Sequence, residues 1–115
     1  MDEPTPKDLK ALFLIRLEEE LRALREASEH TAADRRPVEL DQQSVGRLSR
    51  MDAMQQQAMA SAQETRRNGR GRALEAAIAR IEIGEFGWCD ECGDFIGLGR
   101  LELDPTVMRC RDCAT

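Results

Sequence analysis

The stretch GWCDECGDFIGLGRLELDPTVMRCRDC, residues 87–113, contains every cysteine of this 115-residue chain. The cysteines form two C-x-x-C pairs with seventeen residues between them. This spacing is typical of a four-thiolate zinc site, in which each pair supplies two ligands to one tetrahedral ion. Four thiolates leave no open coordination position, so the zinc is expected to be structural rather than catalytic. The expected ligands are Cys89, Cys92, Cys110 and Cys113.

Two other uses of paired cysteines compete with zinc. Disulfides require an oxidising compartment, whereas the N-terminus MDEPTPKD does not resemble a signal peptide and no apolar run is long enough to span a membrane. A thioredoxin-like centre needs only one C-x-x-C pair, in a strand–helix setting. Gly87 and Gly93 flank the first pair and allow the backbone to turn its N–H groups toward sulfur. These observations favour zinc in a cytoplasmic protein.

Composition and charge narrow the possible functions. Charged residues make up 34% of the chain and aromatic residues only 3%, which suits long helices better than a large globular core. Lys and Arg outnumber Asp and Glu in residues 41–83, by 7 to 5, whereas residues 84–115 carry 3 bases and 7 acids. Four thiolates on one zinc ion make that last segment more negative still. Direct DNA binding by the cysteine segment is therefore disfavoured.

The first helix is expected over about residues 6–30. No Gly or Pro interrupts the run KDLKALFLIRLEEELRALREASEH, and its leucines recur at spacings of three and four. Thr5 is expected to be the N-cap, with Pro6 at the first helical position and Asp8 at the third. His30, the only histidine, is interpreted as a solvated residue near the helix C-terminus rather than a metal ligand.

A second helix is expected to end near residue 83, before Gly84. It is rich in Ala, Met, Gln and Arg, and it carries an apolar stripe close to its end. Asn68, Gly69 and Gly71 weaken its middle. These glycines are either a tolerated cost of about 1 kcal/mol each or the sign of a bend or a close helix crossing.

Together these segments predict an all-α protein. Neither long helix can bury its apolar stripe alone, so the expected arrangement is an antiparallel helical hairpin, a coiled coil, over residues 1–83. Its turn, or tip, is expected within about residues 31–53, where Pro37 and Gly46 break the helical pattern. Residues 84–115 are expected to form a small C-terminal four-cysteine zinc-finger module.

The cysteine segment resembles the zinc finger of the DksA/TraR family of bacterial transcription regulators. The shared features are Gly87 before an aromatic residue, a first C-x-x-C followed by glycine, Ile96, Arg100 with Leu101, Pro105, and a second C-x-x-C. The resemblance implies a protein that binds RNA polymerase and inserts the tip of its hairpin into the secondary channel. It implies regulation of initiation in the stringent response, often together with the alarmone ppGpp, by acidic residues at the tip.

The tip differs from the family pattern. The better-known members of the family carry D-x-x-D-x-A at this place, and residues 31–60 contain no such string. Asp41 retains the first acid, but Ser44 stands where the second is expected, and Asp52 is followed directly by alanine. Asp41 and Asp52 are therefore either partial tip motifs or helix-start caps that touch no partner.

Arg47 and Arg50 are the basic candidates for partner binding near the tip. They are either part of a solvated helix face or cations that contact an acidic protein surface or nucleotide phosphates.

Other functions compete with polymerase binding. A helical hairpin is a general recognition surface, so a zinc-stapled adaptor for another protein is the main alternative. A thiol oxidoreductase that uses Cys89 and Cys92 is the weakest, because the sequence contains no set of residues typical of catalysis. The protein is therefore expected not to be an enzyme.

Overall fold

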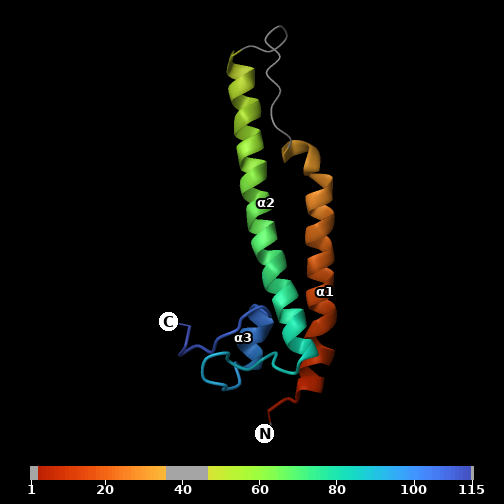
Figure 1. Ribbon diagram of the computed structural model, residues 1–115, viewed down its shortest axis with the longest axis vertical. Helices are drawn as coiled ribbons and strands as arrows, with labels where there is room; N and C mark the ends of the chain where they lie inside the picture. The colour runs from red at the N-terminus through yellow and green to blue at the C-terminus, as the bar shows by residue number, and fades with distance from the viewer. Residues whose placement is uncertain (1–2, 36–46, 115) are drawn as a thin grey trace. The chain divides into compact units, whose positions relative to one another are not determined.

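The computed structural model describes residues 3–35 and 47–114, except for the side chains of residues 34 and 47–49. Its elements are α1 (Pro6–His30), a short 3-10 helix η1 (Ala32–Arg35), α2 (Arg47–Glu82) and α3 (Leu98–Leu103), shown in Figure 1. Within the described ranges the only β interaction is an isolated antiparallel bridge between Trp88 and Phe95. The prediction of an all-α fold is confirmed.

α1 begins at a reciprocal capping arrangement. The backbone N–H of Asp8 donates to Thr5 Oγ1 at 3.2 Å, and the backbone N–H of Thr5 donates to Asp8 Oδ2 at 3.0 Å. These bonds satisfy N–H groups that have no partner inside the helix. Hydrogen bonds from the Thr5 backbone and then from its hydroxyl lower the pKa of Asp8. The helix start expected at Thr5 is confirmed.

The chain divides into two compact units. We call the first, Met1–Arg22 together with Gly71–Thr115, the cysteine unit, and the second, Ala23–Arg70, the polar unit. Each long helix contributes residues to both. The division into a hairpin of residues 1–83 and a module of residues 84–115 stays a prediction.

The cysteine unit contains an antiparallel helix pair. A Cβ placed on Gly71 would lie 3.8 Å from Leu21 Cδ1, and one placed on Gly84 would lie 3.9 Å from Pro6 Cβ. The start of α1 therefore faces the end of α2. The buried side chains of this pair are Leu9, Phe13, Leu17 and Leu21 from α1, and Leu74, Ala77 and Ile81 from α2.

The glycines in α2 do not interrupt the helix, which continues from Arg47 to Glu82. Within the cysteine unit, the 3.8 Å separation at Gly71 is an ordinary van der Waals contact, so an alanine methyl group would fit against Leu21. Gly71 is therefore a tolerated cost rather than a requirement of close packing.

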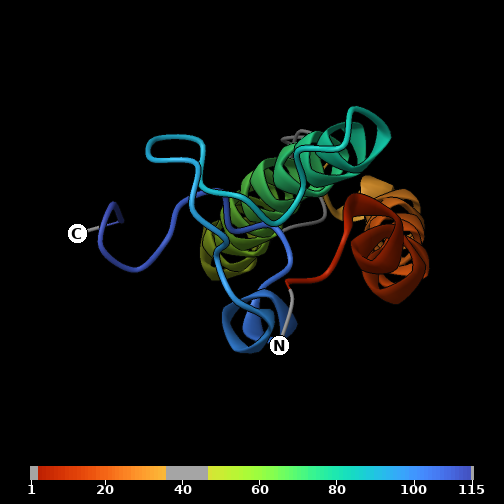
Figure 2. The same ribbon diagram turned by 90° about the horizontal axis from the view of Figure 1, so that it is seen from below.

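The C-terminal segment packs on this helix pair within the cysteine unit. The chain leaves α2 at Gly84, whose φ is 77°, and Phe86 packs on Phe13 with ring centroids 5.6 Å apart. Leu101 of α3 and Pro105 are fully buried. Figure 2 shows the loop of residues 84–97 leading from the end of α2 to α3.

The polar unit packs differently. The α2 side chains that are half-buried here recur at spacings of three and four, as in a coiled-coil seam. They are Arg50, Ala53, Gln57, Ala60, Glu64, Arg67 and Arg70. None of the described residues of this unit is a buried hydrophobic one.

A polar cluster takes the place of a core in this unit. Glu64 Oε2 accepts hydrogen bonds from Ser28 Oγ at 2.9 Å and from Arg67 Nη1 at 3.5 Å, and it lies 3.1 Å from Arg35 Nη1. Thr31 Oγ1 accepts from Arg35 at 2.9 Å and from Arg67 at 3.1 Å. These five residues, which we call the polar clasp, join the end of α1 and η1 to α2.

The polar clasp also completes the C-terminus of α1. The carbonyl oxygen of Ala27 accepts a hydrogen bond from the Thr31 hydroxyl at 2.9 Å, and that of Ser28 accepts one from Arg35 Nη1 at 3.0 Å. Carbonyls in the last turn of a helix have no partner inside it, so these bonds stabilise the helix end.

Among the helices of the described residues, none is both long and apolar enough to cross a bilayer.

Candidate metal centre

The four cysteines meet in one cluster. One Sγ atom from each lies within 4.8 Å of all the others, and Cys92 Sγ is 3.6 Å from Cys110 Sγ. All four are free thiols rather than disulfides. Zinc–sulfur bonds of about 2.3 Å place the sulfurs of a tetrahedral site about 3.8 Å apart. The donor atoms and their spacing therefore fit one zinc ion.

The first cysteine pair lies in a narrow turn. The Cys89 N–H donates to Asp94 O at 2.8 Å, and the Gly93 N–H returns to Cys89 O at 3.0 Å. The Glu91 N–H points at Cys89 Sγ, 3.4 Å away. Backbone N–H groups directed at sulfur stabilise a thiolate and fix its orientation.

The second pair is tied to the first by the backbone and by Arg109. The Asp90 N–H donates to Met108 O at 2.9 Å, which joins the two turns. Arg109 lies 3.5 Å from Asp90 and 3.1 Å from Glu91 through its guanidinium, and its carbonyl accepts from Arg100 Nε at 3.2 Å. The two halves of the site are therefore held together by contacts other than the metal.

The thiols differ in their affinity for protons. Burial opposes ionisation of Cys89, but backbone N–H groups of Cys110, Cys92 and Glu91 outweigh it and lower the pKa of that thiol to about 6. Hydrogen bonds with the thiols of Cys110, Cys89 and Cys92 raise the pKa of Cys113. A backbone hydrogen bond from Asp94 favours the Cys92 thiolate, but the Cys110 thiol, burial and the Cys89 thiol together outweigh it and raise the pKa of Cys92. Zinc binding by four thiolates therefore releases protons.

Gly87 fixes the approach of this segment to α1. Its φ is 96°, a conformation that residues with a side chain rarely adopt. A Cβ here would lie 2.6 Å from Leu9 Cδ1 and 3.6 Å from Leu101 Cδ1. The sequence favours glycine here because the backbone can turn beside the first cysteine pair, and the structure shows in addition that a side chain at this position would collide with the core leucine of α1.

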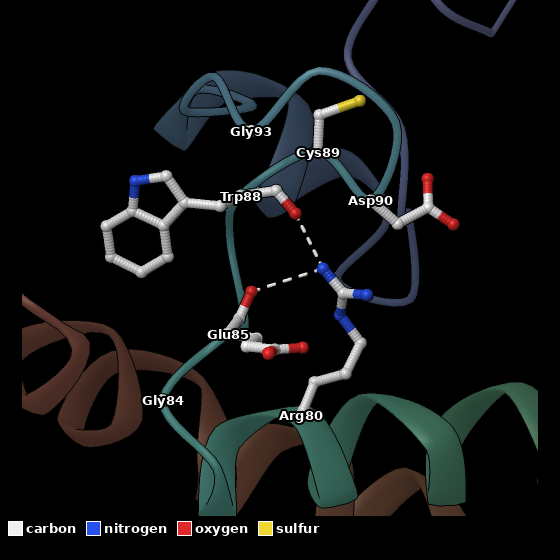
Figure 3. Close-up of a pocket in the computed structure, with 7 residues that line it drawn as sticks. All are labelled: Arg80, Gly84, Glu85, Trp88, Cys89, Asp90 and Gly93. Atoms are coloured by element: carbon white, nitrogen blue, oxygen red, sulfur yellow. Dashed lines mark hydrogen bonds between the residues drawn. The ribbon is translucent and has the colours of Figure 1, made fainter.

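An open pocket of about 400 Å³ lies beside the first pair, lined by residues 80, 84, 85, 88–90 and 93. Figure 3 shows the Arg80 side chain reaching from α2 to the backbone of this loop. Sequence reasoning did not identify Arg80, since one arginine in a basic helix carries no distinctive signal. The polar clasp was also missed, although Glu64 and Arg67 follow the seam spacing.

The expected partner-binding residues are only partly described. Asp41 lies outside the described residues. Arg47 begins α2, and nothing is described of its side chain. Arg50 is half-buried and Asp52 is exposed, both near the start of α2. Their roles in binding stay predictions.

A helical hairpin with a four-cysteine zinc-finger module is thus the class of protein that fold and site define. Residues 84–115 match the family described as "Prokaryotic dksA/traR C4-type zinc finger". This match and the cysteine cluster support one structural zinc ion.

Known proteins match a short stretch of this chain. A stretch of 42 residues is 45% identical to the RNA polymerase-binding transcription factor DksA of Haemophilus influenzae and covers 36% of this chain and 29% of that protein. The corresponding protein of Escherichia coli K12 is 43% identical over 42 residues, 28% of its length. The matched stretch thus spans less than a third of these relatives.

The fold similarity extends further. The structure of transcription factor DksA2 from Pseudomonas aeruginosa superposes with a TM-score of 0.70 at 23% identity, covering 98% of this chain and 82% of that one. The chain is therefore a DksA-like zinc-finger protein in its fold and C-terminal module.

Proposed function

We propose that this protein is a bacterial transcription regulator that binds RNA polymerase directly. The observation that carries the proposal is the 45% identity, over 42 residues, to a relative named for RNA polymerase binding. The likeness of the fold to transcription factor DksA2 supports it, because the similarity covers 98% of this chain. The relatives are named as transcription factors, and we propose a non-enzymatic role here as well.

The hairpin end is the proposed working part. In this proposal, the tip, within about residues 31–53, enters the secondary channel, where Asp41 and Asp52 approach the active centre. Exposure of Asp52 is compatible with such a contact. Arg47 and Arg50 supply positive charge for acidic protein surface or for ppGpp phosphates. The regulator acts in the cytoplasm on initiation.

The zinc finger has a structural role in this proposal. Four thiolates fill the coordination sphere of zinc, so no position is left for a substrate or an activated water. The finger carries seven acids against three arginines, which disfavours contact with a DNA backbone. The finger instead stabilises the helix pair of the cysteine unit.

Competition binding tests polymerase recognition. Zinc-loaded protein is titrated against bacterial core RNA polymerase that carries a labelled DksA, in parallel with a DNA-binding assay at low salt. Displacement of the label without DNA binding is the expected result. No displacement at saturating protein would contradict the proposal.

Variants test the tip. Asp41→Asn and Asp52→Asn are compared with Glu18→Gln, which removes an exposed charge of α1. All three are expected to displace DksA, while one or both aspartate variants lose the effect on initiation in transcription reactions with and without ppGpp. Aspartate variants that regulate as well as Glu18→Gln would remove Asp41 and Asp52 from the mechanism.

An adaptor for another protein is the second candidate. Met51, Met54 and Met59 of α2 are 58%, 55% and 60% exposed, and methionine side chains adapt readily to varied protein surfaces. Affinity capture from bacterial lysate separates the candidates. Polymerase subunits are recovered if the first is correct, and a different protein that depends on these methionines is recovered if the second is correct.

A further inference from the structure

One arginine connects α2 to the first half of the metal centre. Arg80 lies in the last turn of α2. Its carbonyl oxygen accepts hydrogen bonds from the N–H groups of Glu85 at 2.9 Å and Phe86 at 3.2 Å. Its guanidinium Nη2 donates to the carbonyl oxygens of Glu85 at 3.1 Å and Trp88 at 2.6 Å, the two dashed lines of Figure 3. A single residue thus makes four hydrogen bonds to the segment that leads to Cys89.

The bond to Trp88 is the one that reaches the metal ligand. The Trp88 carbonyl belongs to the same planar peptide unit as the Cys89 N–H. That N–H donates to Asp94 O at 2.8 Å, so both ends of the peptide are held. Fixing this plane restricts the position of the Cys89 Cα atom and therefore of its sulfur.

Arginine suits this position for two physical reasons. Its guanidinium is planar and always charged, and Nη2 carries two N–H groups in fixed directions, so this one nitrogen can donate to two carbonyls. Its positive charge also lies beside Cys89, in the lining of the same pocket. Four thiolates on one zinc ion carry a net negative charge, which this cation offsets. Cys89 is only 4% exposed, so its side chain has little room to change orientation and depends on the backbone for its position.

We propose that Arg80 is a positioning residue of the zinc site, which presets Cys89 for the metal and couples metal binding to the end of α2. Because coupling between two equilibria is reciprocal, zinc stabilises the Arg80 bonds as much as these bonds favour zinc. Loss of zinc therefore frees the amides of Glu85 and Phe86 to exchange with solvent.

Zinc competition with a chromogenic chelator tests the proposal directly. Arg80→Gln is compared with Arg72→Gln, which removes a charge from an exposed arginine of the same helix. Outer-shell partners of metal ligands typically contribute about 10- to 100-fold to affinity, so Arg80→Gln is expected to bind zinc at least about tenfold more weakly. Arg72→Gln is expected to match the wild type, and circular dichroism should show unchanged helix content in both zinc-loaded variants.

Arg80→Lys is a second variant that tests the proposal if Arg80→Gln does not fold. Lysine keeps the charge but lacks the planar fork, so its zinc affinity is expected to lie between those of the wild type and Arg80→Gln. In the wild type, hydrogen exchange at Glu85 and Phe86 should accelerate on zinc removal. The proposal is overturned if Arg80→Gln, or Arg80→Lys when only this variant folds, binds zinc as tightly as Arg72→Gln.

Discussion

The cysteine unit and the polar unit are built from the same two helices but are stabilised by different interactions. Each buried hydrophobic residue among those described belongs to the cysteine unit, which also contains the thiol cluster. The polar unit instead has a seam of alanine, glutamine and charged residues, fastened by the polar clasp. One unit gains its stability from burial and metal binding, whereas the other gains a defined pairing from directional bonds.

The difference has an energetic basis. Burying a leucine or phenylalanine contributes about 1.5–3 kcal/mol, whereas a net intramolecular hydrogen bond contributes about 0.5–1.5 kcal/mol. Polar groups in a seam contribute less to stability but can fix which residues face each other, as single polar positions do in coiled coils. We therefore expect the cysteine unit to unfold last and the clasp to define helix register.

The largest expected effect comes from removing a metal ligand. Cys110→Ser leaves three thiolates and disrupts the tetrahedral site, so the variant should lose its zinc. Amides of residues 84–114 should then exchange rapidly, while much of the hairpin helicity persists by circular dichroism. Zinc content is measured by atomic spectroscopy, with Met108→Leu as a control in the same module. Stoichiometric zinc in Cys110→Ser would refute the ligand assignment.

The second-largest effect is expected from truncating a core side chain, which should lower the free energy of unfolding far more in the cysteine unit than an exposed truncation does in the polar unit. Leu74→Ala removes a side chain that is 0% exposed and should lower the free energy of unfolding by about 2–5 kcal/mol. Met54→Ala, at a position 55% exposed in the polar unit, should change it by about 0.5 kcal/mol or less. Urea unfolding of the zinc-loaded proteins measures both, and equal losses would contradict the contrast between the units.

Disrupting the clasp should have a smaller and local effect. Glu64→Gln preserves size but removes the negative charge shared by Arg35 and Arg67, and should cost about 1–2 kcal/mol. Hydrogen exchange should increase around residues 28–35, while zinc affinity stays unchanged. Glu82→Gln, an exposed glutamate of the same helix, is the control. Exchange rates that match this control would show that the clasp does not stabilise the polar unit.

The smallest expected effect is at the start of α1. Thr5→Ala removes the N-cap and should lower the free energy of unfolding by about 1 kcal/mol in urea at neutral pH. Because its pKa is lowered, the Asp8 carboxylate contributes stability above its usual pKa, and this contribution is lost as the pH falls through the lowered value. Lys10→Ala is the matched exposed control, and an equal stability for both variants would argue against the capping role.

Several parts of this structure could be predicted from local sequence. The N-cap at Thr5, the long helices and the glycine after α2 follow from spacing and from residues with strong local preferences. The four cysteines indicate a common site because their spacing suits one tetrahedral ion, and their Sγ atoms do converge. The expected tip residues could not be assigned in the same way, since Asp41 and Arg47 follow no comparable spacing rule.

Contacts between residues that are distant in sequence could not be predicted from the sequence. The sequence favours glycine at position 87 for a turn, but only the folded chain shows Leu9 Cδ1 2.6 Å from where a side chain would begin. Arg80 and Glu64 looked like ordinary charges on a helix until the structure showed their hydrogen-bond partners.

The sequence by itself determined what depends on neighbours along the chain: helix starts and ends, the amphipathic stripes and the set of metal-binding thiols. The tertiary structure decided what depends on residues distant in sequence: which stripe faces which, the clasp between Ser28 and Glu64, and the hold of Arg80 on the Trp88 carbonyl. Hydrogen bonds and close packing require particular atoms within a few ångströms, and that proximity arises only when the chain folds back on itself.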